Sequence, residues 1–318
     1  DYLPDFNFNN TAARAFSVAN ALEWVTKYNV DGLRLDAVKH IEKSWLRDLR
    51  AKLISDVQPK RNNTQVYLVG ETFSGDRQLL KEYIDPCSML DGQFDFLLRA
   101  TILEKILMRR GTMNELEQFY KDNDAAFASA LMSTFIGNHD IPRVIHFAED
   151  NPQWGDAWAG GRERAWSNQP ATVGSQNAYE RVALGMTLLY TNQGVPLVYY
   201  GDEVGLPGAG DPDNRRAMQW SGYNGGQQWL LDRMKKLGTA RAAHPALRKG
   251  TRTTLSVSAD TWAYQQATGN DRVLVLLNRS DGPRQISLPA GTYRDELTGA
   301  MVSGTANVPA RGAMLLVP

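Results

Sequence analysis

Short apolar runs and longer amphipathic stretches alternate along the first 245 residues or so of the chain. The apolar runs predict strands, and stretches with apolar residues at helical spacing, such as Trp45, Leu46, Leu49 and Leu53, predict helices. The predicted strands cover residues 29–35, 65–69, 88–94, 133–136 and 194–200. The predicted helices cover residues 42–56, 97–109, 113–128, 179–190 and 228–243. This alternation predicts βα units that form a parallel sheet.

About five strands are too few to close an eight-stranded (β/α)8 barrel, or TIM barrel, so we expect an α/β fold with part of such a barrel. After His244 and Pro245 the pattern changes to short β-like runs separated by turn signals such as Gly269-Asn270. These runs cover residues 251–257, 261–266, 272–277, 285–288 and 313–317. They predict a small antiparallel β domain, of the β-sandwich type, at residues 247–318.

The composition excludes several classes of protein. The chain has 35 Lys plus Arg and 35 Asp plus Glu, which argues against a nucleic-acid or membrane-surface role, since both need a large positive surface. No apolar run approaches the roughly 20 residues of a membrane span. The single cysteine, Cys87, excludes an intrachain disulfide and a cysteine-ligated zinc site, and we expect it to be a small buried residue.

Three acidic residues, Asp36, Glu71 and Asp140, follow the ends of three predicted strands. In a βα barrel the active site lies at this face. Alternate residues of a strand point the same way, so Arg34 and Asp36 should face the barrel mouth together. Arg34 can then hold Asp36 in the ionised form that a nucleophile requires. Glu71 ends a buried apolar run, which favours the protonated form that a general acid requires.

One ionised and one protonated carboxyl are the machinery of glycoside hydrolysis. Asp36 and Glu71 are one βα unit apart, on strands that should be neighbours. Because neighbouring strands lie about 4.7–4.9 Å apart, we expect a carboxyl separation near the roughly 5–5.5 Å of retaining enzymes.

Five segments resemble, in order and spacing, regions of the α-amylase family of retaining glycoside hydrolases and transglycosylases. They are Asp31-Gly32-Leu33-Arg34-Leu35-Asp36-Ala37-Val38-Lys39-His40, Val69-Gly70-Glu71-Thr72, Phe135-Ile136-Gly137-Asn138-His139-Asp140, Leu3-Pro4-Asp5-Phe6-Asn7 and Gly194-Val195-Pro196-Leu197-Val198-Tyr199-Tyr200-Gly201-Asp202-Glu203. The resemblance covers the whole chain. It implies that residues 1–12 end the family's inserted second domain, residues 13–246 form the second half of the barrel (strands four to eight), and residues 247–318 form the C-terminal β domain.

At matching positions the resemblance implies Asp36 as nucleophile, Glu71 as acid/base, and Asp140 as a third carboxylate that binds and distorts the sugar. Further substrate-binding residues implied in the same way are Arg34, Lys39, His40, His139, Asp211 and Arg215. The pair Lys39-His40 is more typical of enzymes that act on α-1,4 chains than of oligo-1,6-glucosidases.

One family signature, an Asp…Asn-His stretch after the third barrel strand, is missing from the sequence. The sequence begins at Asp1, with neither a Met nor a signal-like region. We therefore expect an upstream segment or a second chain to complete the barrel, and the 318-residue chain alone to be inactive. The family implies a structural Ca2+ ion, of whose ligands only the backbone carbonyl of His40 would lie here. We expect a secreted or periplasmic rather than a cytoplasmic location, although no signal is visible.

The segment from residue 146 to 175 is a long loop that follows Asp140, so it should overhang the active-site mouth. It contains Trp154, Trp158 and Trp166. Trp154 is the candidate for stacking on a sugar ring, and the alternative is that these tryptophans pack the loop down. Residues expected to be structural are His146, His244, the pair Asp202-Glu203, and Arg143, which should anchor the loop by a salt bridge.

The expected activity is retaining hydrolysis of α-1,4-glucosidic bonds in starch, maltodextrins or related α-glucans by double displacement. An α-glucan transglycosylase of the same family uses the same three carboxylates, and the motifs do not separate the two. A non-catalytic amylase-like subunit is the third alternative. The expected partner is an α-glucan oligosaccharide or polysaccharide, with no nucleic acid and no membrane.

Overall fold

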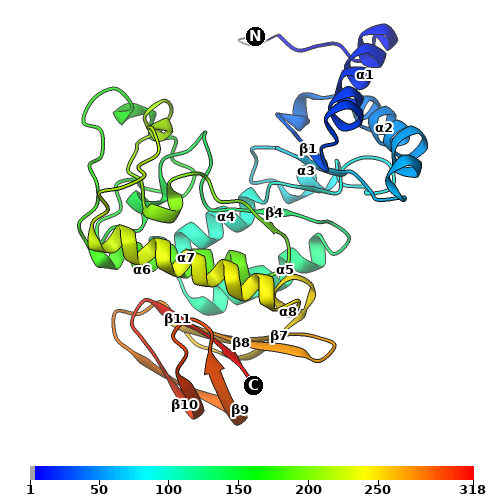
Figure 1. Ribbon diagram of the computed structural model, residues 1–318. Helices are drawn as coiled ribbons and strands as arrows, with labels where there is room; N and C mark the ends of the chain where they lie inside the picture. The colour runs from blue at the N-terminus through cyan, green and yellow to red at the C-terminus, as the bar shows by residue number, and fades with distance from the viewer. Residues whose placement is uncertain (1–3) are drawn as a thin grey trace. The chain divides into compact units, whose positions relative to one another are not determined.

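The computed structural model describes residues 4–318 (Figure 1), so Leu3 of the sequence motif lies outside the described residues. The chain divides into two compact units. Unit 1 contains Asp1–Leu97 and Asn123–Ser133, and unit 2 contains Leu98–Asp122 and Thr134–Pro318. Nowhere in residues 4–318 is there a helix of the length and apolar character that crossing a membrane requires.

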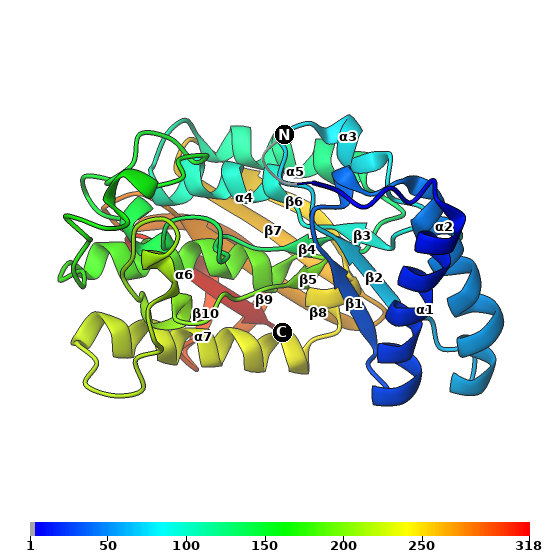
Figure 2. The ribbon, with the colours of Figure 1, turned by 90° about the horizontal axis from the view of Figure 1, so that it is seen from above.

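Three parallel strands form the sheet of unit 1 (Figure 2), in the order β1 (Gly32–Leu35), β2 (Tyr67–Gly70) and β3 (Gly92–Gln93). The register pairs Leu35 with Gly70, and Gly70 with Gln93, so the three strands end at the same level. The residues that come next in the chain therefore emerge side by side at one edge of the sheet.

The helices of unit 1 cover this sheet. They are α1 (Thr11–Tyr28), α2 (Lys43–Lys52), which continues as a π-helical turn at Leu53–Val57, and the short α3 (Arg77–Lys81). The Asn10 side chain caps α1 by accepting the N–H groups of Ala12 and Ala13 at 3.0 and 3.1 Å. Apolar side chains from α1, α2 and β2, among them Val18, Leu49 and Leu68, make one core.

A buried ion pair ties α2 to the sheet of unit 1. Nη2 of Arg50 lies 2.6 Å from Oδ2 of Asp91, and Nε and Nη1 donate to the carbonyls of Met89 and Val66 at 2.9 and 3.0 Å. Asp91 also accepts the N–H of Leu68 at 2.6 Å. All three guanidinium nitrogens are therefore hydrogen-bonded inside the fold.

Unit 2 contains α6 (Gln176–Thr191), α7 (Gly225–Ala243), α8 (Ala246–Lys249) and the short β5 (Val195–Pro196). The elements α4 (Phe96–Ile102), α5 (Met113–Ala126) and β4 (Ser133–Thr134) each cross the boundary between the units. β4 pairs with β5, and the N–H of Leu197 donates to the carbonyl of Thr134 at 2.8 Å.

The C-terminal strands form one six-stranded antiparallel sheet in the order β10-β9-β11-β8-β7-β6. They are β6 (Thr251–Val257), β7 (Thr261–Thr268), β8 (Asp271–Asn278), β9 (Arg284–Asp295), β10 (Met301–Val308) and β11 (Gly312–Val317). The antiparallel prediction is confirmed. The sandwich of two separate sheets is not what forms, because β11 hydrogen-bonds both β8 and β9 and joins all six strands into one sheet.

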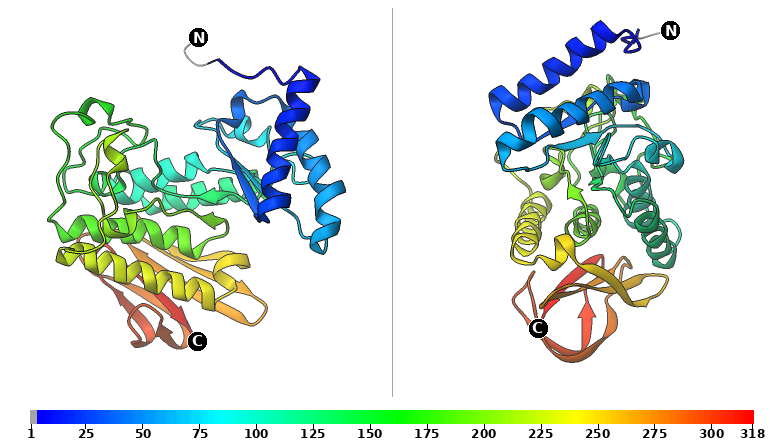
Figure 3. Two further views of the ribbon diagram at one scale, coloured as in Figure 1. Left: turned by 45° about the horizontal axis from the view of Figure 1, so that its top comes forward. Right: turned by 90° about the vertical axis from the view of Figure 1, so that its right-hand side faces the viewer.

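The central strands β8 and β11 of the C-terminal sheet are buried on both faces. Trp262, Tyr264 and Val275 belong to the same core as α6, α7 and α8, which lie against the sheet in Figures 1 and 3. The alternate residues, such as Leu274 and Leu276, belong to a second core with residues of β9, β10 and β11. Two buried faces explain why the central strand β8 is apolar at successive positions, from Val273 to Leu277.

Candidate active site

The carboxylate of Asp36 stands at the end of β1. Its Oδ1 forms an ion pair with Nη1 of Arg34, as the alternation of side chains along the strand predicts. Cζ of Arg34 lies 5.6 Å from the centroid of the Phe94 ring, which follows β3. The side chain of Asp36 is 73% exposed. The guanidinium is therefore held between an aromatic ring and a carboxylate that faces solvent.

Glu71 occupies the corresponding position after β2, and it is buried. Its Oε2 accepts the N–H of Ala37 at 3.1 Å, its own N–H donates to the carbonyl of Leu35 at 2.8 Å, and its carbonyl accepts the N–H of Val38 at 2.8 Å. Three hydrogen bonds thus bind Glu71 to the residues on either side of Asp36. They hold the two acidic residues side by side.

Ala37 makes the turn between these two acidic residues possible. Its φ of 47° lies in the left-handed region, which costs an L-residue about 1–2 kcal/mol. This conformation begins the short 3-10 helix Val38–His40 and aims the Ala37 N–H at Glu71. Strain of this kind persists only where the surrounding structure fixes it, which the bonds to Glu71 do here.

The two residues after Val38 face different surroundings. Nζ of Lys39 donates to the carbonyl of Phe73 at 3.2 Å, and the carbonyl of Lys39 accepts the hydroxyl of Tyr83 at 3.2 Å. His40 is exposed. Arg34, Asp36, Lys39, His40 and Glu71 are therefore gathered around one strand-end edge within unit 1.

Unit 2 contains a second acidic cluster, around Asp140. Oδ2 of Asp140 lies 3.3 Å from Nε2 of His139, and Oδ1 lies 3.4 Å from Nη2 of Arg215. Nε of Arg215 in turn lies 3.0 Å from Oδ1 of Asp211 and donates to the carbonyl of His139 at 3.1 Å. Four predicted site residues thus meet, with one guanidinium between two carboxylates.

Asn214, which was not among the predicted site residues, fixes the backbone of this second cluster. Its amide is buried and donates to the carbonyls of His139 and Ile141, both at 2.8 Å. Asn138 adds a local turn, because its Oδ1 accepts the N–H of Asp140 at 2.9 Å. The only available signal was the position of Asn214 next to the predicted substrate residue Arg215.

A buried arginine–aspartate pair also lies in unit 2. Nη1 of Arg143 lies 3.3 Å from Oδ1 of Asp202 and also donates to the carbonyl of Tyr200. The guanidinium stacks over the rings of Tyr199 and Tyr200, 4.2 and 4.7 Å from their centroids. Burial raises the pKa of Asp202 to about 7, against the opposing effect of Arg143. Arg143 is therefore a structural anchor, as predicted.

The structure contradicts two predictions about single residues. Trp154 does not offer a sugar-stacking face, because the residue is only 4% exposed. Its ring packs against His146 and Phe147, and its Nε1 donates to Glu163 at 3.0 Å. Trp154 therefore packs the loop down. Cys87 is exposed rather than buried, because it lies in a turn where its N–H donates to the Asp85 side chain.

The two histidines predicted to be structural have structural partners. His146 is buried, its Nδ1 lies 2.8 Å from Glu149, and burial lowers its pKa. Nδ1 of His244 lies 2.9 Å from Asp271.

The predicted calcium ligand, the carbonyl of His40, finds no supporting ligand set. Ca2+ takes six to eight oxygen ligands, and residues 4–318 contain no group of three or more His, Cys, Asp or Glu side chains placed to hold a metal. The described residues do not by themselves fit a calcium site. The ion stays a prediction and enters no step of the proposed reaction.

Comparison with known proteins identifies the family. Residues 1–160 match the family described as alpha amylase, catalytic domain. The chain is 26% identical over 98% of its length to a cyclomaltodextrin glucanotransferase of Bacillus sp. (strain 1-1), and 29% identical over 87% of its length to a beta/alpha-amylase of Paenibacillus polymyxa. It spans 40% of the first of these proteins and 20% of the second.

Solved structures show the same fold. An alpha-amylase from Geobacillus thermoleovorans, complexed with acarbose, superposes with a TM-score of 0.80 at 23% identity, covering 99% of this chain and 65% of that one. A cyclic alpha-maltosyl-(1→6)-maltose hydrolase from Arthrobacter globiformis, complexed with maltose, superposes with a TM-score of 0.75 at 25% identity, covering 100% of this chain and 62% of that one. Parallel strands ending in acidic residues, together with an antiparallel C-terminal sheet, thus define an α-amylase-like fold. The chain belongs to the alpha-amylase family of glycoside hydrolases and related transferases.

Proposed function

We propose that this protein hydrolyses α-1,4-glucosidic bonds of starch, maltodextrins or related α-glucans with retention of configuration. The observation that carries the proposal is the bond between Oε2 of Glu71 and the N–H of Ala37, next to Asp36. It holds the Glu71 carboxyl against the main chain of the residue that follows Asp36, and a double displacement requires two carboxyls close together. The acarbose and maltose complexes of the structural relatives support a glycan as substrate.

In the proposed reaction Glu71 gives its proton to the glycosidic oxygen while a carboxylate oxygen of Asp36 attacks the anomeric carbon. The bond to the leaving sugar breaks, and a covalent glycosyl-enzyme forms. Glu71 then removes a proton from water, which attacks the anomeric carbon and releases Asp36. In this proposal Arg34, which forms an ion pair with Asp36, orients the attacking carboxylate.

The other predicted site residues have supporting roles in this proposal. Asp140 and His139 contact the sugar at the cleavage point, and Asp211 and Arg215 hold the non-reducing side. Lys39 and His40 lie on the leaving-group side. The contacts of Arg215 with both Asp140 and Asp211 support a shared role for these residues in unit 2.

Three variants test the proposal. Asp36→Asn and Glu71→Gln should each lower turnover on maltooligosaccharides by at least about a thousandfold, because each removes a group that acts in the chemical step. Asp31→Asn is the matched control, since Asp31 precedes the same strand and its side chain is 97% exposed. Near-native turnover of either test variant contradicts the assignment.

Chemical rescue separates the roles of the two acids. Azide should restore turnover to Asp36→Ala by attacking the anomeric carbon in its place. Glu71→Ala should keep activity toward substrates whose leaving group needs no proton. Assays should compare the 318-residue chain with a chain extended upstream, because we propose that upstream sequence completes the barrel. Activity of both forms contradicts that part of the proposal, and inactivity of both supports a non-catalytic subunit.

Transglycosylation is the second candidate, and the cyclomaltodextrin glucanotransferase relatives favour it. The same carboxylates would form the glycosyl-enzyme, and a sugar hydroxyl would replace water in the second step. Product analysis at high maltooligosaccharide concentration decides between the two. Products longer than the substrate, or cyclic products, indicate transfer, whereas exclusively shorter products indicate hydrolysis.

A further inference from the structure

The buried carboxylate of Asp202 contacts both ends of the segment that carries His139 and Asp140. Nη1 of Arg143, three residues after Asp140, lies 3.3 Å from its Oδ1. At the other end, a Cβ atom on Gly137 would collide with its Oδ2, so the bare backbone of Gly137 packs directly on the carboxylate. One side chain of a residue that is 1% exposed therefore fixes this segment from two sides.

Arg143 extends this contact toward the exposed part of the Asp140 cluster. Its guanidinium lies over the Tyr199 ring, 4.2 Å from the centroid. The same ring lies next to His139, with the two centroids 6.5 Å apart. Nε2 of His139 in turn lies 3.3 Å from Oδ2 of Asp140. A continuous chain of contacts thus joins the buried carboxylate of Asp202 to the exposed carboxylate of Asp140.

The guanidinium of Arg143 has few other polar contacts to fix its position. Nη1 donates to the carbonyl of Tyr200 and lies against Asp202, whereas Nε and Nη2 have no hydrogen-bond partner within residues 4–318. Because one nitrogen makes these polar contacts, the guanidinium can pivot about it. We therefore expect the guanidinium, and the Tyr199 ring that lies against it, to respond to a change in Asp202.

The charges around Asp202 make its attraction for Arg143 depend on pH. Burial raises the pKa of Asp202 to about 7. The charges of Arg143 and of Arg99 in α4 act in the opposite direction, and the charge of Glu203, the next residue, adds to the rise. Asp202 is therefore mainly ionised at pH 8 and mainly protonated at pH 6. Only the ionised form attracts the guanidinium by its charge.

We propose that Asp202 is a positioning residue for His139 and Asp140. Through Gly137 and Arg143 it holds His139 against Asp140, and its ionised form does so more firmly. The purpose of this arrangement, which is to place His139 and Asp140 on a sugar, rests on the proposed function. The link between Asp202 and His139 rests on the contacts themselves.

Imidazole resonances of His139 test this link without an assay of activity. In the 15N-labelled 318-residue chain at pH 8, these resonances, assigned with His139→Ala, should shift in Asp202→Asn and in Arg143→Met. The rest of each spectrum shows that the variant is folded, and Asp202→Asn keeps the shape of the side chain if Arg143→Met does not fold. Unchanged His139 resonances in folded Asp202→Asn overturn the proposal.

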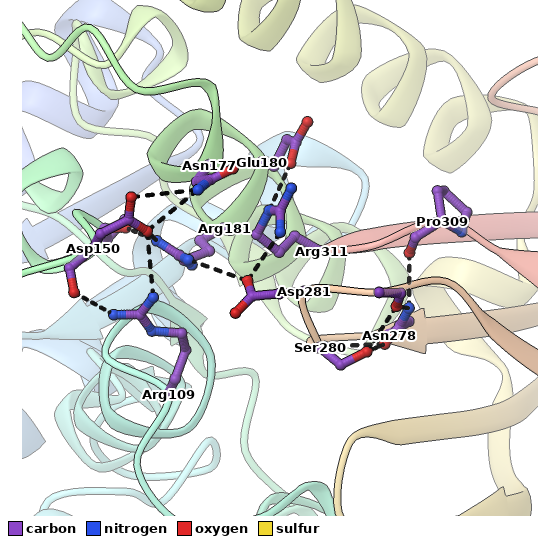
Figure 4. Close-up of polar contacts among 12 residues, drawn as sticks. Arg109, Asp150, Asn177, Glu180, Arg181, Asn278, Ser280, Asp281, Pro309 and Arg311 are labelled. Atoms are coloured by element: carbon purple, nitrogen blue, oxygen red, sulfur yellow. Dashed lines mark hydrogen bonds and ion pairs between the residues drawn. The ribbon is translucent and has the colours of Figure 1, made fainter.

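A second buried arginine of unit 2 provides the matched control (Figure 4). Arg181 lies 2.8 Å from Asp150 and 3.4 Å from Asp281, and it donates to the carbonyl of Ala148 at 2.8 Å. These partners lie outside the Asp140 cluster. Arg181→Met therefore removes a buried cation of the same kind and should leave the His139 resonances in place. A shift as large as that in Arg143→Met would indicate general loosening and overturn the link.

Kinetics on maltooligosaccharides tests what the link does for the reaction. At pH 8, Asp202→Asn should lower turnover by at least about tenfold in the native background, but by less than about twofold when His139→Ala is already present, since it acts through His139. At pH 6 the loss in the native background should shrink, because the native Asp202 is then itself protonated. Equal losses in both backgrounds and at both pH values overturn the positioning role.

The outcomes separate this inference from the proposed function. If Asp36→Asn and Glu71→Gln retain native turnover while the His139 resonances still respond to Asp202→Asn, the catalytic proposal fails and the link stands. If the two catalytic variants lose turnover while the His139 resonances ignore Asp202→Asn, the link fails and the catalytic proposal stands.

Discussion

The two acidic clusters are fixed by different parts of the chain. Asp36 and Glu71 are held by strand register and by three hydrogen bonds, each involving main-chain atoms of residues 35–38 or of Glu71 itself. Asp140 is held by side chains that follow it by about 75 residues, from Asn214 and Arg215. A cluster fixed by register follows from local sequence, whereas one fixed by distant side chains depends on the tertiary fold.

The buried arginines of the two units differ in how many of their guanidinium nitrogens have hydrogen-bond partners. Arg50 in unit 1 has a partner for each of its three nitrogens. In unit 2, Nε and Nη2 of Arg143 have no hydrogen-bond partner among the described residues. Oδ2 of Asp202, with which Arg143 forms its ion pair, has none there either. We therefore expect unit 1 to depend strongly on one satisfied ion pair, and unit 2 to respond to pH.

Arg50→Met should produce the largest loss of stability. It leaves the carboxylate of Asp91 buried without its cation, which costs about 3–5 kcal/mol in the free energy of unfolding. Urea denaturation of the variant measures this loss. The control is Arg14→Met, since the ion pair of Arg14 with Asp48 is partly exposed and should contribute at most about 1 kcal/mol. Equal losses in the two variants would contradict the importance of the buried pair.

Asp202→Asn should change the pH dependence of stability. The pKa of Asp202 is raised from its usual 3.8 to about 7. The stability that the protonated side chain contributes to the folded state is therefore fully present below pH 4 and is lost as the pH rises through 7. Between these values the native free energy of unfolding should fall by up to about 1.4 kcal/mol per pH unit because of this group. Urea denaturation at pH 5, 6, 7 and 8 gives the free energy of unfolding at each pH. Plotted against pH, this free energy should fall less steeply for the variant than for the native chain. An unchanged slope means that Asp202 does not titrate in this range.

Asn214→Ala should lower the free energy of unfolding by about 1–2 kcal/mol. It removes two hydrogen bonds that the neutral amide donates, and leaves the carbonyls of His139 and Ile141 without them. Because these bonds position His139 and Asp140, turnover should fall by more than the Michaelis constant changes. The comparison is steady-state kinetics of Asn177→Ala, whose amide donates to the exposed Asp150 outside this cluster. Equal kinetics for the two variants would show that Asn214 does not position the cluster.

Ala37→Gly should have the smallest effect and the opposite sign. Glycine adopts a φ of 47° without strain, so the variant should gain up to about 1 kcal/mol while it keeps the N–H that Glu71 accepts. Ala19→Gly, at an exposed position inside α1, should lose about 1 kcal/mol. Thermal melts of both variants check the contrast. A lower melting temperature for Ala37→Gly would contradict backbone strain at Ala37.

The sequence predicted the elements that have strong periodicity and missed those without it. The runs that became β1, β2 and β8 were identified, although β1 is four residues long where seven were predicted. α1 was missed because its exposed aromatic residues, Phe16 and Trp24, blur the apolar stripe. β10 was missed because most of its residues are exposed and one is a glycine.

Prediction of the site followed the same division. The ion pair between Arg34 and Asp36 follows from alternation within one strand. The hydrogen bonds of Asn214 to the main chain beside Asp140 and the burial of Trp154 depend on which distant segments pack against these residues. No local sequence pattern specifies that packing. The grouping of Asp211 and Arg215 with Asp140 was available only through the family resemblance.

The strand order of the C-terminal sheet has a consequence for how the protein is made. β11, which follows the other five strands of this sheet in sequence, lies in the interior of the sheet between β8 and β9. During synthesis the β6–β8 meander and the β9–β10 hairpin therefore emerge as two unjoined pieces, each with an open edge. Until β11 is inserted, the apolar surface that α6 and α7 will share with this sheet stays incompletely covered. A chain that ends before residue 312 would keep these open strand edges and this exposed apolar surface. We therefore expect it to aggregate or to be degraded by proteases.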